Sequence, residues 1–418
     1  MTDYKKSDFK REYNEKWNFK DGSMRELVHG LHPYPAMMMP LIARAMFEKY
    51  GKKSDTVFLD PYVGSGTALV EAQFYGAKKA IGIDLNPLAI LISKVKTQEN
   101  DVILLADEIN LFNQTINDIT KAQAPCFSIR DSWFNEKSIT ELSKIRYYIA
   151  SITDKKVKDF FKVAFSEVVR SCSETRNGEF KLYRMTKQSL AKFNPEPIKT
   201  FKEILKRNFG IVKNASYSKN TSIELYNENT LNLSSHGDLT GNVDLIITSP
   251  PYGDSHTTVA YGQFSRLSNE WLGFEGAATL DKRLLGGKKV KDREFGIFEL
   301  DDAIVKIKAK DKTFTRDRAW EVVAFYNDYE ESIKAVANTV KSGGYIVYVV
   351  GNRRVRNIEL PMDIITYKMF EKLGFKHITT HVRDILNKRM PSKASPSHAI
   401  GGQISTMMQE YIVIMKKK

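Results

Sequence analysis

The segment from residue 56 to residue 84 constrains the fold of this chain more than any other stretch. It reads as a short buried strand (56–60, TVFLD), a glycine-rich turn (61–67, PYVGSGT), a helix (68–76) and a second strand (79–84, KAIGID). Two strands joined through a helix within about thirty residues are typical of a right-handed parallel crossover. The chain is therefore predicted to contain an α/β domain built on a parallel sheet.

The same pattern returns later in the chain, separated by two segments of a different kind. Further strands are predicted at 222–231, 243–248, 345–351, 376–382 and 410–416, with helices at 32–51, 321–341 and 361–373. We divide the chain into a loosely attached N-terminal arm (1–28), one α/β core in three parts (29–99, 221–273 and 321–418), a helical insertion (100–220) and a basic, loop-rich insertion (274–320).

Composition narrows the class of protein. The chain has 418 residues, 42% of them apolar, which is enough for a sizeable core. Its formal net charge of +14 favours polyanionic partners, nucleic acid before an acidic membrane surface. A signal peptide and an apolar run long enough to span a membrane are both missing, so the expected compartment is the cytoplasm. Neither Cys126 nor Cys172 belongs to a CxxC pair, so no metal site is expected.

The glycine-rich turn carries the first functional signal. Gly64 and Gly66 would let the backbone approach a ligand at a strand–helix junction, where the amides of the helix N terminus face it. Asp84 ends the second strand about twenty residues later, where an acidic residue can hold both hydroxyls of a ribose. Asp60 precedes the turn and suits a cationic amine. A ribose with an ammonium group indicates S-adenosylmethionine rather than a dinucleotide.

The second signal is the stretch TSPPY at 248–252, directly after a buried strand. Pro250 and Pro251 fix φ and remove two backbone donors, so nearby carbonyl groups point in set directions without a local amide. The Ser249 side chain and the Pro250 carbonyl can accept the two hydrogens of an exocyclic amino group, and Tyr252 can stack on the ring that carries it. Acceptors that strengthen as methyl transfer proceeds would stabilise the transition state.

At this point the sequence resembles a known family. FLDPYVGSGT (58–67) looks like motif I of the amino-group DNA methyltransferases, and TSPPY looks like their motif IV. The serine form, SPPY, resembles the cytosine-N4 branch. LHPYPAMMMP (31–40) resembles the segment that precedes motif I and packs on the methionine part of the cofactor.

The resemblance implies a fold and a set of roles. The fold is a Rossmann-like, seven-stranded, S-adenosylmethionine-dependent methyltransferase sheet with a reversed final hairpin, interrupted here by the two insertions. The target base would be flipped out of the duplex into a pocket formed by Ser249, Pro250, Pro251 and Tyr252. The residues implied to bind S-adenosylmethionine are His32, Pro33, Tyr34, Pro35, Asp60, Tyr62, Gly64, Gly66, Thr67, Asp84, Leu85, Asn86, Asn229 and Thr230.

Two departures from the family pattern affect these assignments. The strand expected to contact the adenine usually ends in a turn with aspartate, whereas here it reads YNENT and Asn229 stands in that place. The insertion at 100–220 is large, so motif order does not show which segment reads DNA. Basic residues near aromatic ones, or in flexible loops, are the candidates for DNA contact: Arg170, Arg176, Lys181, Arg184, Lys288, Lys289, Arg389 and Lys393.

The sequence therefore predicts a sequence-specific methyltransferase that modifies cytosine N4 in double-stranded DNA, the protective half of a restriction–modification pair. Its expected partners are duplex DNA and a cognate restriction endonuclease, and its oligomeric state is open. Three alternatives stay open: an adenine-N6 DNA methyltransferase, an RNA base methyltransferase, and a nucleic-acid-binding protein without catalysis.

Overall fold

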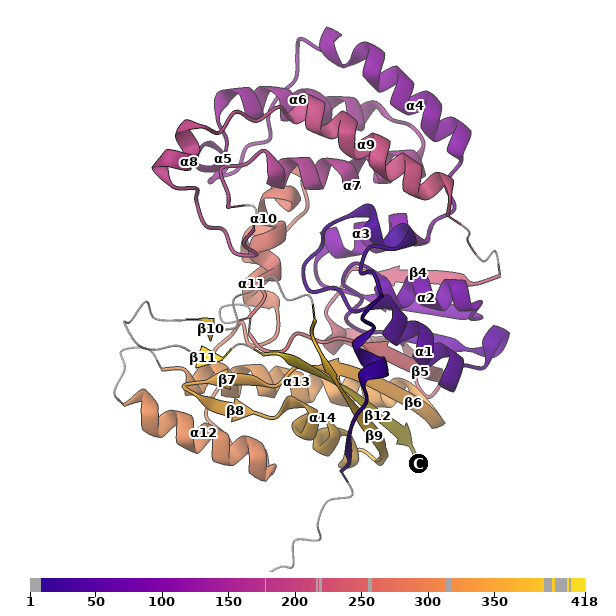
Figure 1. The fold of residues 1–418 in the computed structure, drawn as a ribbon, viewed down its shortest axis with the longest axis vertical. Helices are drawn as coiled ribbons and strands as arrows, with labels where there is room; N and C mark the ends of the chain where they lie inside the picture. The colour runs from indigo at the N-terminus through magenta and orange to yellow at the C-terminus, as the bar shows by residue number, and fades with distance from the viewer. Residues whose placement is uncertain are drawn as a thin grey trace, which may run out of the picture.

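The computed structural model of the chain describes residues 9–176, 178–215, 217, 220–254, 258–312, 317–386, 393–394, 404–405 and 407–418. It consists of an α/β core and a lobe of helices that stands above one end of the core (Figure 1). The lobe corresponds to the helical insertion expected from the sequence. None of the helices in the described ranges is both long and apolar enough to cross a membrane.

One mixed sheet organises the core, with strand order β1-β9-β12-β6-β5-β2-β3-β4. Only β12 is antiparallel to its neighbours, β6 and β9, which gives the reversed hairpin expected from the sequence. The strand bounds are β1 Arg11–Tyr13, β2 Val57–Asp60, β3 Lys79–Ile83, β4 Ser222–Tyr226, β5 Val243–Thr248, β6 Val340–Val350, β9 Phe375–Asp384 and β12 Gln409–Lys417. The sheet thus has the seven strands that were predicted and an eighth, β1, that was not.

Helices cover both faces of this sheet, because its central strands alternate two sets of apolar side chains. On one face Phe58, Leu245 and Val347 pack against α1 (Pro40–Tyr50) and α2 (Thr67–Tyr75). On the other face, Leu59 and Ile246 pack against α13 (Ala319–Thr339) and α14 (Met362–Glu371). Burial on both faces explains why these strands read as nearly continuous apolar runs.

The helical lobe has an apolar core of its own, which continues into the α/β core. The lobe consists of α4 (Val102–Thr115), α5 (Arg130–Trp133), α6 (Glu136–Ser151), α7 (Lys155–Ser171), α8 (Lys187–Ala191) and α9 (Pro197–Lys213). Phe161, Phe165 and Phe201 form its centre, together with Trp271 from α10 (Tyr261–Leu272). α3 (Pro87–Thr97) and α10 pack against α7, so these two helices join the lobe to the core.

The second insertion is less irregular than the sequence suggested. Between α10 and α13 it forms α11 (Leu280–Arg283) and the fourteen-residue helix α12 (Phe298–Asp311). Leu300, Ile304 and Ile307 of α12 are buried against the core. The structure also has two small antiparallel pairs of strands, β7 (Arg353–Val355) with β8 (Ile358–Leu360) and β10 (Lys393–Ala394) with β11 (Ile404–Ser405).

The N-terminal arm is docked on the core from residue 9 onward, which corrects the expectation of a loose attachment. β1 pairs in parallel with β9 at the edge of the sheet. Arg11 forms a bidentate ion pair with Asp363 of α14, at 2.7 and 3.0 Å. The Trp17 side chain is buried and stacks on His381 of β9. The three polar residues of β1 gave no detectable sequence signal, because the two elements that hold them, β9 and α14, come from the far end of the chain.

Candidate active site

The turn after β2 requires glycine at two positions. Gly64 and Gly66 have φ angles of 50° and 81°, in the left-handed region that side chains disfavour. A Cβ atom on Gly66 would lie 2.8 Å from Oγ of Ser93 in α3. The Ser93 hydroxyl donates to the Gly64 carbonyl oxygen at 2.9 Å. The turn is therefore held directly against α3, and α2 begins from it at Thr67.

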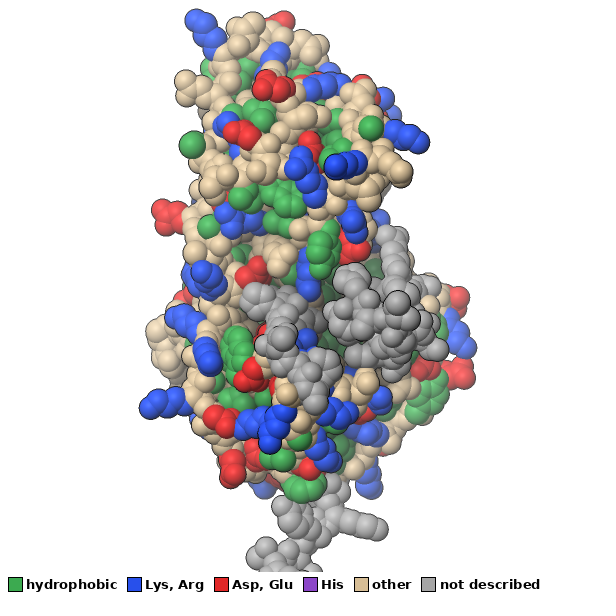
Figure 2. Space-filling model, turned by 90° about the vertical axis from the view of Figure 1, so that its left-hand side faces the viewer, with side chains coloured by type: hydrophobic (Ala, Val, Ile, Leu, Met, Phe, Trp, Pro, Cys, Tyr) green, Lys and Arg blue, Asp and Glu red, His purple; other side chains and the backbone are tan. Residues whose placement is uncertain are grey.

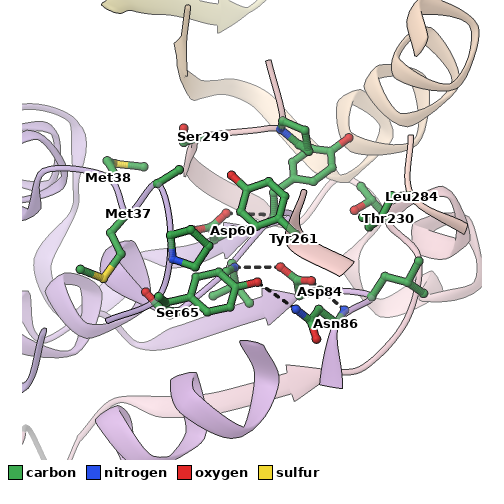
Figure 3. Close-up of a pocket in the computed structure, with 18 of the residues that line it drawn as sticks. Met37, Met38, Asp60, Ser65, Asp84, Asn86, Thr230, Ser249, Tyr261 and Leu284 are labelled. Atoms are coloured by element: carbon green, nitrogen blue, oxygen red, sulfur yellow. Dashed lines mark hydrogen bonds between the residues drawn. The ribbon is translucent and has the colours of Figure 1, made fainter. Parts of the chain in front are cut away.

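A cavity lies where the carboxyl ends of β2, β3 and β5 meet (Figure 3). Ligands of α/β sheets bind at such a place. It is lined by most of the residues predicted to bind a cofactor: Tyr34, Pro35, Asp60, Tyr62, Gly64, Thr67, Asp84, Leu85, Asn86, Asn229 and Thr230. Ser249 and Pro251 line it as well. The structure thus brings the two sequence motifs to one cavity.

Asp84 holds the floor of this cavity together. Its Oδ2 atom accepts a hydrogen bond from the Gly64 amide at 2.9 Å, and Oδ1 accepts one from the Asn86 amide at 2.8 Å. Burial raises the pKa of Asp84 to about 6, although these backbone bonds favour the charged form. The carboxylate keeps further lone pairs that face the cavity, so it can accept hydroxyl groups of a ligand.

Asp60 connects the two motifs. Its Oδ1 atom accepts hydrogen bonds from the Thr248 hydroxyl at 2.6 Å and from the Tyr62 amide at 3.1 Å. Burial raises the pKa of Asp60 to about 7. Because Thr248 is the last residue of β5, this bond fixes the start of the SPPY turn relative to the glycine turn. A cationic group in the cavity would lower the cost of keeping Asp60 charged.

Helix α10 contributes to the cavity through a group of polar and aromatic side chains. The side-chain amide of Asn86 donates through Nδ2 to the hydroxyl groups of Tyr34, at 3.0 Å, and Ser265, at 2.9 Å. Tyr261, the first residue of α10, lines the cavity and stacks on Tyr34 with ring centroids 6.1 Å apart. Both phenol rings form a flat wall beside Asp84.

Several residues that line the cavity were not predicted from the sequence. These are Ala36, Met37, Met38, Val63, Ser65, Ala68, Tyr261, Arg283, Leu284 and Leu285. The first six lie in or directly after the segments 31–40 and 58–67, so their position next to the motifs could have predicted them. Arg283 to Leu285 come from the second insertion, whose sequence gives no sign that it reaches the cavity.

Three residues predicted to bind the cofactor do not line the cavity, namely His32, Pro33 and Gly66. His32 is buried, and its Nε2 atom lies 3.1 Å from the Ser166 hydroxyl of α7. Burial lowers the pKa of His32 to about 3, so the ring is neutral at physiological pH. This position fits a contact between the core and the helical lobe better than a contact with a ligand.

The SPPY turn lies at the rim of the cavity. The Tyr252 hydroxyl is 3.1 Å from Oγ of Ser249 and 3.2 Å from Oε1 of Glu410 in β12. Pro250 is buried, whereas Ser249, Pro251 and Tyr252 are partly exposed. Neither Pro250 nor Tyr252 lines the cavity itself. The turn thus presents a hydroxyl and an aromatic ring beside the cavity.

The predicted DNA contacts fall into different positions. Figure 2 shows a hollowed face between the helical lobe and the core, with lysine and arginine side chains above and below it. Arg176, Arg184, Lys288 and Lys289 have exposed side chains. Arg184 forms an ion pair with Glu174 at 2.5 Å, and Lys181 is half-buried. Arg389 lies outside the described residues, and only the backbone of Lys393, in β10, is described.

Arg170 does not fit the expected phosphate contact. The residue is 9% exposed, and its guanidinium donates to the backbone carbonyls of Phe264, at 3.1 Å, and Glu179. The same group stacks over the Phe264 ring at 4.5 Å. Burial lowers the pKa of Arg170 to about 10. Arg170 therefore links α7 to α10, and the prediction that it contacts a phosphate was wrong.

Comparison with known proteins places this geometry in a family. An RMKL-like methyltransferase domain matches residues 31–122. The chain is 36% identical to the Type II methyltransferase M.MvaI of Kocuria varians, over 96% of this chain and 94% of that protein. It is 21% identical to the Type II methyltransferase M.BsoBI of Geobacillus stearothermophilus, over 97% of this chain and 88% of that protein. The solved structure of an rRNA methylase from Streptococcus thermophilus aligns over 91% of this chain and 98% of its own length. The identity is 7% and the TM-score 0.31, so this similarity carries no information on the substrate.

The cavity fits S-adenosylmethionine, the cofactor of this family. Two carboxylates, Asp60 and Asp84, suit a ligand that carries ribose hydroxyls, an ammonium and a sulfonium. The apolar side chains of Met37, Met38 and Leu285 suit its hydrocarbon and adenine parts. Among the described residues, no group of three or more His, Cys, Asp or Glu side chains is placed to hold a metal ion.

The pKa of Asp84 makes cofactor affinity depend on pH. Only the charged carboxylate is a pure acceptor for ribose hydroxyls, so binding favours loss of the proton. Because the pKa of Asp84 is raised to about 6, the contribution of this carboxylate to affinity should be constant above pH 7 and fall below pH 6. We expect the Kd for S-adenosylmethionine to rise about tenfold between pH 8 and pH 5 through this group. Calorimetry across that range tests this, and in Asp84→Asn the contribution should vanish.

Lys96, near the C terminus of α3, is fully buried, and its Nζ atom lies 4.0 Å from the Met37 sulfur. Burial lowers its pKa to about 7. The unfolded chain binds this proton up to higher pH than the folded one, so stability should rise from pH 7 towards pH 10. We expect Lys96→Met to increase the free energy of unfolding by about 3 kcal/mol at pH 6, and less at pH 9. Urea denaturation at both pH values measures this, and an equal gain at both would contradict it.

Proposed function

Because the chain belongs to the Type II DNA methyltransferase family, we propose that it methylates the exocyclic N4 of cytosine in double-stranded DNA. The proposal assigns it the modification half of a restriction–modification pair. The observation that carries it is the placement of Ser249 and Pro251 at the rim of the cofactor cavity, joined to Asp60 through Thr248. An acceptor hydroxyl and an aromatic ring beside a methyl-donor site suit a planar base with an amino group.

Each residue of the turn has a role in this proposal. Ser249 Oγ and the Pro250 carbonyl oxygen accept the two hydrogens of the target amine. As these acceptors draw on the hydrogens, the nitrogen lone pair becomes available out of the plane of the ring. Tyr252 stacks on the base and fixes its plane relative to the cavity. When bound, S-adenosylmethionine supplies an electrophilic methyl group.

The cavity residues prepare the other half of the reaction. Asp84 holds the cofactor's ribose, and Asp60 faces its cationic part. Tyr34 and Tyr261 form an aromatic wall beside Asp84. The target base must leave the duplex to reach Ser249, because this residue lines the cofactor cavity and is only partly exposed.

Adenine N6 is the second candidate base, because both target bases carry an amino group that the same two oxygens can accept. The serine of SPPY favours cytosine. The exposed cations Arg176, Arg184, Lys288 and Lys289 are proposed to contact the DNA backbone.

The choice of polymer can be tested with purified protein and S-adenosylmethionine that carries a tritiated methyl group. Three acceptors of identical sequence are compared: duplex DNA, its separated strands, and double-stranded RNA. The proposal requires label in duplex DNA well above the other two, and strongly reduced label in duplex DNA with Asp84→Ala at the same cofactor concentration. Preferential labelling of RNA would replace DNA with RNA as the substrate.

A further inference from the structure

A chain of hydrogen bonds runs from the base pocket to the last strand of the sheet. It begins at Ser249 Oγ, which lies 3.1 Å from the Tyr252 hydroxyl. The Tyr252 hydroxyl donates to Oε1 of Glu410 at 3.2 Å. Oε2 of Glu410 accepts from Nη1 of Arg383 at 2.7 Å. Nothing in the family comparison or in the sequence motifs assigns a role to Glu410.

The direction of the proton in each bond follows from the chemistry of the groups. Glu410 is paired with Arg383, so it is a charged carboxylate and can only accept. Burial, followed by the nearby Glu410 charge, raises the pKa of Tyr252 well above its usual value, so the phenol keeps its proton. A bond to a carboxylate is roughly twice as strong as one between neutral groups, so the single Tyr252 proton points to Glu410.

This direction determines the state of Ser249. With its own proton committed to Glu410, the Tyr252 oxygen can only accept from Ser249, so the Ser249 hydroxyl proton points towards Tyr252. The lone pairs of Ser249 Oγ are then turned away from Tyr252 and towards the cavity side. A hydroxyl can donate or accept, but a methyl acceptor amine needs an oxygen that accepts.

We propose that Glu410 is a positioning residue that makes Ser249 a hydrogen-bond acceptor for the target amine, acting through Tyr252. This inference rests on the proposed function of the SPPY turn, and it holds for either target base. It explains how a serine can occupy a place that requires a hydrogen-bond acceptor. A carboxylate two hydrogen bonds away fixes the orientation of the serine's hydroxyl proton.

Glu410 is itself held in place by the N-terminal arm. The Arg383 side chain is 7% exposed, and its Nε atom donates to the backbone carbonyl of Trp17 at 2.9 Å. Trp17 is buried against His381 of the same strand as Arg383. The arm therefore fixes Arg383, which in turn fixes Glu410. Docking of the arm thus orients these two side chains in addition to covering the edge of the sheet.

The variant Glu410→Gln tests the direction of the chain with little change in shape. Arg383 would donate to the amide oxygen of the new side chain. The NH2 group of that same amide would then donate to the Tyr252 oxygen. The Tyr252 proton would then point to Ser249, and the Ser249 proton would point at the base. We expect single-turnover methyl transfer to DNA to slow about tenfold or more, with the Kd for DNA and for S-adenosylmethionine changed less than twofold.

A double-mutant cycle separates this role from a merely structural one. Tyr252→Phe keeps the ring and removes the hydroxyl, so it should also slow transfer, and adding Glu410→Gln should then slow it no further. Glu359→Gln, which alters an exposed ion pair with Arg354, is the matched control and should leave the rate unchanged. Melting temperatures of all variants identify any loss of folding.

The outcomes are distinct. A rate for Tyr252→Phe equal to that of wild type, or effects of the two substitutions that multiply, would overturn the role of Glu410. If Glu410→Gln does not fold, the Tyr252→Phe rate alone still decides. A wild-type protein that methylates adenine would refute the proposed base, whereas the cycle, measured on adenine, would still report on Glu410.

Discussion

Replacement of Asp84 by alanine is expected to weaken S-adenosylmethionine binding by about 100-fold or more, the largest effect on cofactor affinity of any single change. The substitution removes an acceptor for the cofactor's ribose and also the two bonds that hold Gly64 and Asn86. Loss of two hydrogen bonds to a charged group costs about 3 kcal/mol or more. Isothermal titration calorimetry with S-adenosylmethionine and S-adenosylhomocysteine measures the effect.

Two controls make the Asp84 result specific. Asp238 is an exposed carboxylate, and Asp238→Ala should leave affinity unchanged. The affinity of Asp84→Ala for duplex DNA should stay within threefold of wild type, because the base pocket is formed by another turn. Cofactor binding by Asp84→Ala within threefold of wild type would show that the cavity does not hold the cofactor as we describe.

Replacement of Tyr252 by alanine is expected to lower kcat/KM for DNA by about 100-fold. Stacking of a base on an aromatic side chain contributes about 1–3 kcal/mol, and loss of the hydroxyl also frees the Ser249 proton. The affinity for S-adenosylmethionine should not change, since Tyr252 does not line the cofactor cavity. Steady-state kinetics with a defined duplex gives this value, and calorimetry checks the cofactor.

Tyr252→Phe is the natural comparison, because it retains stacking and loses only the hydroxyl. Its kcat/KM should lie between those of wild type and Tyr252→Ala. If both variants lose activity equally, stacking contributes little, and the ring serves only to carry the hydroxyl.

The core of the fold could be predicted because local signals in the sequence agree with the tertiary structure. The residues 56–84 contain a strand, two glycines that must take left-handed φ, a helix and a strand, and each element has its own signature. The SPPY turn follows β5 at the residue expected. The shared cavity then follows from topology, because parallel strands place their carboxyl ends at one edge of the sheet.

The features that were missed depend on contacts between distant segments. The polar strand β1 exists because Arg11 meets Asp363, far away in the sequence. Arg170 looked like a phosphate ligand, yet carbonyls of Phe264 and Glu179 surround its guanidinium. Glu410 reads as the polar start of a final strand, and only the folded chain brings it to Tyr252. Sequence patterns report which residues are apolar or charged, but not which distant group each one meets.

The most direct test of the account is to express the protein in a host without other DNA methyltransferases and to analyse its genomic DNA by nucleoside mass spectrometry. Wild type is compared with Tyr252→Ala at equal levels of folded protein. We expect N4-methylcytosine with wild type and a strongly reduced amount with the variant. N6-methyladenine in its place would contradict the assigned base, and neither modified base would contradict the proposed reaction on DNA.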